Sequence, residues 1–188
     1  NKIFFIELWY FCSYITFIFQ RVYLKFMSIQ INYKGRHLNK NLNNFVLFVD
    51  ENFNITGLRK YLSKSDYYFV DDLLKINDKK KEILFFDINS RKKIILVSFK
   101  KNVTYSETES LGAKFYDHIK EIKQNNFIIN SDITKSISKK FIGHFLHGIK
   151  LKSYIFEKYK SKKSIKKMTI TVIGKNLTPK ADQLKFKA

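Results

Sequence analysis

Hydrophobic and polar residues alternate along residues 29–33, Ile-Gln-Ile-Asn-Tyr, a pattern typical of a β-strand with one buried face. Residues 45–49 form a continuous apolar run instead, as expected for a strand that is covered on both faces. Residues 94–97, Ile-Ile-Leu-Val, are also apolar on both faces, which predicts a central position in a sheet. Further strands are predicted at 82–88, 127–129 and 168–174.

Two longer segments have the apolar spacing of amphipathic helices. In residues 104–123 the apolar positions fall on one helical face (Leu111, Phe115, Ile119 and Ile122). From about residue 133 to residue 159 an apolar residue recurs every four positions (Ile137, Phe141, Phe145 and Ile149). The first of these helices has two candidate capping boxes, Thr104–Glu107 and Ser106–Glu109. A shorter helix is predicted at 67–76.

The order of these elements indicates the fold class. Strands 82–88 and 93–99 flank Asn89-Ser90-Arg91, a turn-forming sequence that predicts an antiparallel hairpin. The other strands alternate with helices along the chain, which favours an α/β domain. We therefore expect a single domain with a mixed sheet that is flanked by helices.

The two ends of the chain differ from its middle. Residues 1–26 are densely apolar, but their uncharged run from Leu8 to Gln20 spans 13 residues, and a bilayer requires about 20. No small-x-small cleavage site of a signal peptide follows it. We interpret 1–26 as an apolar leader of doubtful origin, either translated upstream sequence before Met27 or a membrane anchor. The domain then covers 27–174, and residues 175–188, which contain Pro179, are predicted to begin a linker.

The net charge of +20 suggests an anionic partner, but only four of the 36 basic residues are arginines. Arginine is the better reader of bases and phosphates, and the favoured residues of this chain all have A/T-rich codons. We therefore expect nonspecific attraction at most, and no nucleic-acid partner. Cys12 is the only cysteine, which excludes an internal disulfide framework and indicates a cytoplasmic protein.

Few residues are candidates for chemistry. His144 and His147 have a spacing that could meet one metal ion, but no acidic residue lies between Thr134 and Ile155, so we predict two solvated side chains. Asp71 and Asp72 are predicted to be solvated helix charges, with Lys75 at i+4 from Asp71. The sequence contains no phosphate-binding glycine motif and no GxSxG. No catalytic or metal-binding residue is predicted, and Gly143 and Gly148 are interpreted as positions of close helix packing.

The segment from Ser153 to Lys163, SYIFEKYKSKK, resembles the SYxFdkYKskk signature of the leucyl (cytosol) aminopeptidase family. The signature ends the last helix of the N-terminal domain in that family. The matching positions are Gly148, Ser153, Tyr154, Phe156, Tyr159 and Lys160. Residues 93–101 also resemble the family's rvlLvGLGkk strand, with Ser98 and Phe99 where the family favours Gly and Leu. We interpret the aromatic residues of the signature as core anchors and its lysines as a solvated helix end, rather than as a binding footprint.

The resemblance implies a macro-like N-terminal domain with a structural and assembly role. The family's larger second domain binds two divalent metals, manganese or zinc, and contains an NTDAEGR motif that this chain lacks. The parent protein would then be a metallopeptidase, a hydrolase that removes N-terminal amino acids from peptides. Its expected partners are its own C-terminal catalytic domain and further copies of itself in a hexamer.

Two other functions remain open from the sequence. The first is a stand-alone macro-like module that binds ADP-ribose or nucleic acid. The absence of glycine-rich loops argues against ADP-ribose, and the scarcity of arginine argues against specific nucleic-acid recognition. The second is a membrane-tethered protein, if residues 3–24 are part of the mature chain; no membrane partner is expected otherwise.

Overall fold

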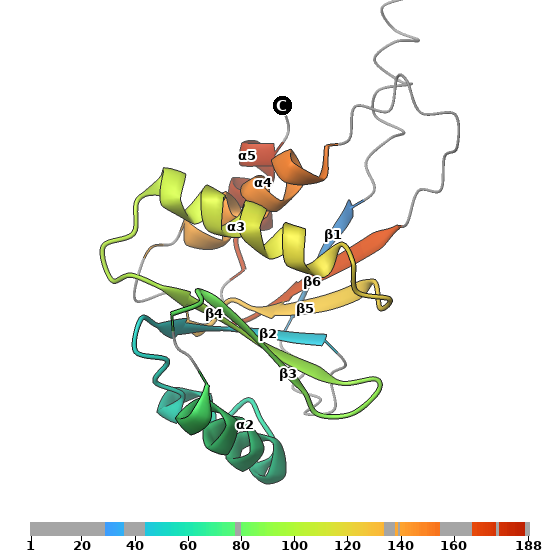
Figure 1. Cartoon of the computed structure of the whole chain (residues 1–188). Coiled ribbons are helices and arrows are strands. Elements are labelled where there is room, and N and C mark those ends of the chain that lie inside the picture. The colour runs from blue at the N-terminus through green and yellow to red at the C-terminus, as the bar shows by residue number, and fades with distance from the viewer. Residues whose placement is uncertain are drawn as a thin grey trace, which may run out of the picture.

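The computed structural model describes residues 29–35, 44–77, 80–133, 138, 140–154, 167–175 and 177–186. These form the strands β1 (Ile29–Lys34), β2 (Asn44–Asp50), β3 (Ile83–Asp87), β4 (Lys93–Phe99), β5 (Asn126–Asn130) and β6 (Met168–Ile173). The helices are η1 (Thr56–Leu58), α2 (Lys64–Ile76), α3 (Tyr105–Ile119), α4 (Phe141–Ser153) and α5 (Pro179–Phe186). Figure 1 shows the sheet between helices on both of its faces.

The sheet is mixed, as the sequence predicts. Its strand order is β1-β6-β5-β2-β4-β3; all neighbouring pairs are parallel except β3 with β4. The β3–β4 pair is the predicted hairpin, and Asn89 builds its turn by accepting hydrogen bonds from the amides of Arg91 and Lys92, both at 2.9 Å. β4 lies between β2 and β3, which confirms the internal position that its apolar sequence predicts.

Two separate cores explain the continuous apolar runs. Helices α3, α4 and α5 cover one face of the sheet, and α2 covers the other (Figure 1). In β2, Val46 and Phe48 point into the α3–α4 core, where Phe48 contacts the rings of Phe141 and Phe145 edge to face, with centroids 5.2 and 5.1 Å away. Phe45, Leu47 and Val49 point into the opposite core beneath α2. Both sides of this strand are therefore buried, and no polar residue interrupts it.

Helix α3 begins with the first of the two predicted capping boxes. The Thr104 hydroxyl accepts from the Glu107 amide at 3.2 Å, and the Glu107 carboxylate accepts from the Thr104 amide at 2.8 Å. Ser106, in the alternative pairing, lies inside the helix. The predicted short helix is also present, as α2, and it begins three residues earlier than expected, with Ser63 as its N-cap.

Helix α4 is shorter than the prediction of 133–159. It begins at Phe141 and ends at Ser153, and Tyr154 has an extended backbone (φ −70°, ψ 105°). The predicted continuous helix through residue 159 is therefore wrong, because α4 already ends at Ser153, where the signature segment begins. Residues 155–166 are outside the described part of the chain.

Part of the predicted linker is a helix. α5 starts at Pro179, whose fixed φ and missing amide hydrogen suit the first helical position. Its Asp182 is 3% exposed and accepts hydrogen bonds from the hydroxyls of Tyr33 (3.1 Å) and Thr178 (3.3 Å). Helix α5 is thus tied to the domain through Asp182, and the interpretation of residues 175–188 as the start of a linker to a further domain stays a prediction.

The described helices are all too short or too polar to span a membrane. The predicted apolar leader, residues 1–26, lies outside the described residues.

Candidate functional site at the carboxyl edge of the sheet

At the carboxyl end of β2, the connections that follow the parallel strands divide between the two faces of the sheet. After β2 it passes to α2 on one face of the sheet, whereas after β4 and β5 it passes to α3 and α4 on the other face (Figure 1). β2 lies between β4 and β5, so neighbouring connections leave the sheet in opposite directions here. In open α/β sheets, ligands bind in the crevice that such a division creates.

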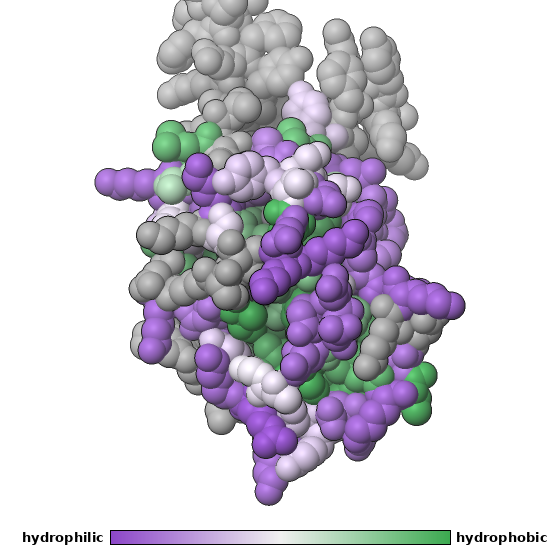
Figure 2. Space-filling view, turned by 90° about the vertical axis from the view of Figure 1, so that its left-hand side faces the viewer, coloured by the Kyte–Doolittle hydropathy of each residue, from purple (hydrophilic) through white to green (hydrophobic). Residues whose placement is uncertain are grey.

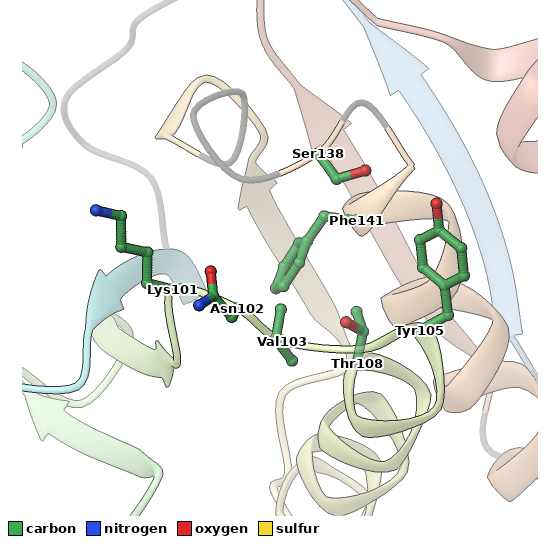
Figure 3. A pocket seen from close by; sticks show the side chains of 7 residues that line it. All are labelled: Lys101, Asn102, Val103, Tyr105, Thr108, Ser138 and Phe141. Atoms are coloured by element: carbon green, nitrogen blue, oxygen red, sulfur yellow. The ribbon is translucent and has the colours of Figure 1, made fainter.

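A cavity of about 270 Å³ lies beside this division, between the β4–α3 connection and the start of α4. Its lining residues are Lys101, Asn102, Val103, Tyr105, Thr108, Ser138 and Phe141 (Figure 3). Val103, which is half-buried, supplies apolar surface, whereas Phe141 is only 2% exposed. Figure 2 views the side of the molecule that carries these connections and shows apolar surface recessed between hydrophilic side chains. The site can therefore hold the apolar part of a small molecule.

The polar groups of the cavity are neutral or basic. The Thr108 hydroxyl donates to the Thr104 carbonyl at 2.8 Å, and the Ser138 hydroxyl accepts from the Lys140 amide at 3.1 Å. The amine of Lys140 lies 5.8 Å from the centre of the Tyr105 ring. No carboxylate is among the described lining residues.

Other carboxylates along this edge accept hydrogen bonds from backbone amides. Asp50 ends β2 and accepts from the amides of Asn52 (3.1 Å) and Asn54 (2.9 Å), which holds Phe53 in a left-handed conformation with φ of 55°. Asp132 follows β5 and accepts from the Lys175 amide at 2.7 Å. These contacts fix the loops around the division rather than presenting acids to a ligand.

The other arrangement with functional interest is the contact between α3 and α4. A Cβ atom on Gly148 would lie 1.9 Å from the carbonyl oxygen of Glu109, and one on Gly112 would lie 2.1 Å from that of Phe145. Each helix thus presents a glycine to the backbone of the other. This geometry confirms the prediction that Gly148, one of the signature positions, lies at a close contact between helices.

Both candidate histidines of α4 lie in this contact. The Nδ1 atoms of His144 and His147 are 2.7 and 3.0 Å from one carboxylate oxygen of Glu109. The His144 ring stacks on Tyr105 with the centroids 4.2 Å apart, and its side chain is 12% exposed. The prediction of two solvated histidines is wrong, because their acidic partner comes from α3 rather than from the helix on which they lie.

The protonation of Glu109 follows from these contacts. Partial burial by itself would raise the pKa of its carboxyl, but hydrogen bonds from His144 and His147 outweigh burial and hold that pKa below its usual value. The carboxylate is therefore ionised at neutral pH and accepts from both rings. His144 Nε2 is buried with no hydrogen-bond partner among the described residues.

Three of the six signature positions lie in the described part of the chain. Gly148 lies at the helix contact, and the buried Ser153 closes α4 by donating its hydroxyl to the Lys150 carbonyl at 2.8 Å. Tyr154 is 57% exposed, so its interpretation as a core anchor is wrong. Phe156, Tyr159 and Lys160 lie outside the described residues, and their roles stay predictions.

The paired acids of α2 are solvated, as predicted. Lys75 lies 3.2 Å from Asp71 and 2.9 Å from Asp72, on an exposed part of the helix. Among the residues that the structure describes, no group of three or more His, Cys, Asp or Glu side chains is arranged to hold a metal ion. The two divalent metals, manganese or zinc, were expected in a separate catalytic domain and stay a prediction.

The sequence did not reveal the cavity or the role of Glu109. The lysine-rich loop after β4 was noted only for its family resemblance, and Glu109 only as a possible helix cap. The available signal was spacing. Tyr105 and Glu109 are four residues apart and so lie on one face of α3, and His144 and His147 are three residues apart and so lie on one face of α4.

The strand order, with one antiparallel edge strand and helices on both faces, defines a three-layer α/β domain. No family model and no curated protein matches this chain. Among solved structures, a mutant of leucine aminopeptidase from tomato matches with a TM-score of 0.61 and 14% sequence identity. The match covers 85% of this chain and 35% of the tomato chain. The fold expected from the resemblance, that of a leucyl aminopeptidase N-terminal domain, is thereby confirmed, and this chain spans about a third of that enzyme's length.

Proposed function

We propose that this chain is the N-terminal domain of a leucyl aminopeptidase-like metallopeptidase and that it serves structure and assembly rather than catalysis. The observation that carries the proposal is the fold shared with tomato leucine aminopeptidase over 85% of this chain. The signature sequence supports it independently, because two of its residues, Gly148 and Ser153, make specific contacts at the helix that the signature closes.

The proposal places the chemistry in another part of the parent protein. Metal-assisted peptide hydrolysis needs several ligands that converge on the ion and a water molecule that the metal activates. Many of the described acids have other roles, in helix caps, turns, the Glu109–histidine contact and surface ion pairs. The parent would remove N-terminal residues from peptides in the cytoplasm, as a hexamer.

A peptidase assay tests the non-catalytic role. The purified 188-residue chain is incubated with leucine p-nitroanilide and with Mn²⁺ or Zn²⁺, and it should release no nitroaniline above the metal-only background. Sustained, metal-dependent release that an active-site chelator abolishes would overturn this role.

The transcript beyond the codon for Ala188 tests the parentage. We expect an open reading frame that encodes an NTDAEGR-type motif. A stop codon in all transcripts would refute the assignment to a larger metallopeptidase, whatever the peptidase assay shows.

A second candidate function, a stand-alone macro-like module that binds ADP-ribose or nucleic acid, is favoured by the cavity at the carboxyl edge. Its 270 Å³ is below the roughly 300 to 1,000 Å³ of pockets that hold drug-sized ligands, so it would receive only part of such a ligand. Calorimetric titration with ADP-ribose and with an oligonucleotide discriminates the two functions. Micromolar binding that persists at high salt would favour the module, since purely electrostatic binding weakens steeply with salt.

A further inference from the structure

We propose that the chain pairs with a second copy of itself through the free edge of β3, so that the two sheets continue into one another. β3 ends the strand order, and among the described strands its only neighbour is β4 (Figure 1). An edge strand presents unpaired backbone groups that can pair with a strand of another chain. The inference names a contact surface that the proposed assembly role leaves open, and it does not depend on any sequence beyond Ala188.

The hydrogen bonds between β3 and β4 determine which backbone groups of β3 face outward. The amide of Ser98 donates to the Glu82 carbonyl at 2.8 Å. In an antiparallel pair every second residue of a strand bonds to its neighbour, so the even-numbered residues of β3 bond to β4. The amides and carbonyls of Ile83, Phe85 and Asp87 therefore face the free edge.

An antiparallel pairing of two β3 strands matches their side chains in one register. With Ile83 opposite Phe85 of the second copy, the reverse pair also forms, because a two-fold axis relates the strands. The same register places Lys81, just before the strand, opposite Asp87 of the second copy. Aromatic–β-branched pairs and opposite charges are both favourable directly across two strands. A shift by two residues in either direction would place Asp87 or Lys81 opposite an apolar residue, so side-chain and charge complementarity favour a second copy in this register.

The side chains at this edge are accessible. Lys81 is exposed, and the side chain of Asp87 is 66% exposed beside its ion-pair partner Lys93. Phe85 is half-buried, with its ring centroid 5.7 Å from that of His118 on α3. One pair of short strands gives an interface below about 1,200 Å², and two chains of net charge +20 repel each other, so we expect a dissociation constant on the order of 100 µM.

Sedimentation velocity of the purified chain tests the proposal. From about 5 to about 500 µM chain, at about 0.15 M salt, the sedimenting mass should rise from one chain of 22.5 kDa to two and stop there, because a two-fold contact closes. Hydrogen exchange at the same concentrations identifies the edge. The amides of Ile83, Phe85 and Asp87 should exchange more slowly as the dimer forms, whereas those of Leu84 and Phe86, already bonded to β4, should change little.

Charge reversals test the register. Lys81→Asp and Asp87→Lys each place like charges opposite one another, and each should weaken the dimer about tenfold. The double variant restores opposite charges and should restore the dimer. Lys81→Asp also lowers the net charge, which by itself favours association, so a weaker dimer identifies the local pair. Lys64→Asp, exposed on α2, is the matched control and should not weaken the dimer.

Four results would overturn the proposal. They are a chain that stays monomeric over this range, growth beyond a dimer, single reversals that dimerise like the wild type, and a double variant that stays as weak as either single one. Circular dichroism of each variant verifies that the fold is kept. None of these results bears on the peptidase assay or on the reading frame beyond Ala188, so the dimer and the parentage fail or stand separately.

Discussion

Replacing Gly148 with alanine tests whether α3 and α4 really touch through their backbones. The added Cβ would lie 1.9 Å from the Glu109 carbonyl oxygen, whereas an ordinary contact begins at 3.4 Å. Both partners are backbone, so no side chain can rotate away. The helices would have to separate locally by about 1.5 Å, the difference between those two distances.

That separation has a calculable cost. Inserting a methyl group into a closely packed site typically costs about 1–3 kcal/mol, and alanine recovers up to about 1 kcal/mol of helix propensity. Movement of α4 also disturbs the contacts of Phe145 with Phe48 and Phe115, at 5.1 and 5.4 Å between ring centroids. We expect a net loss at the upper end of this balance, about 2 kcal/mol, because the helix contact is fully buried at Phe145 and Ile149.

Urea denaturation followed by circular dichroism measures this loss. With a slope of about 2 kcal/mol per M for a domain of this size, the midpoint should fall by about 1 M. Gly57→Ala is the control, since nothing lies within 4 Å of its added Cβ. Gly112→Ala should act like Gly148→Ala, and the double variant should cost less than the sum because one separation accommodates both methyl groups. An unchanged midpoint for Gly148→Ala would refute the close contact.

Three further predictions concern polar contacts. Thr104→Ala removes the capping box of α3 and should cost about 1 kcal/mol in the same denaturation experiment; Ser106→Ala, which leaves the box intact, should cost clearly less. Glu109→Gln should lower stability at neutral pH by about 1 kcal/mol. Because the pKa of Glu109 is lowered in the folded state, its contribution is present above the unfolded pKa and is lost as pH falls through the folded pKa; a wild-type-minus-variant difference that grows on acidification would contradict this. Tyr33→Phe leaves the buried Asp182 with one hydroxyl donor fewer and should cost about 1–2 kcal/mol, with faster amide exchange in α5; exchange unchanged there would show that the hydrogen bond does not hold the helix.

The sheet and its layers were predictable because the relevant signals are local. β2 is apolar from Phe45 to Val49 and β4 from Ile94 to Val97, since each is buried on both faces. The Thr104–Glu107 box needs only residues three apart. The hairpin required only the turn chemistry of Asn89. In each case the residues that determine the element lie within it or next to it.

The contacts between helices were not predictable in this way. His144 and His147 were expected in solvent because α4 was treated as having a single buried face. The helix instead lies against the sheet, α3 and α5, so that most of its positions are covered. Glu109 is 35 residues away from His144 in the chain, and nothing in either local sequence pairs them. The same holds for α5, whose few apolar residues concealed a helix anchored by Tyr33 and the buried Asp182.

The edge strand β1 has a consequence for how the chain folds as it is synthesised. Its parallel partner is β6, and its Tyr33 bonds to Asp182, 149 positions later in the chain. β2, β3 and β4 can pair within residues 44–99, whereas among the described strands β1 has no neighbour until β6 has been synthesised. Such long-range pairing is slow, and the unpaired strand is exposed to aggregation meanwhile. β6 and α5, which are translated long after β1, therefore determine when β1 becomes part of the fold.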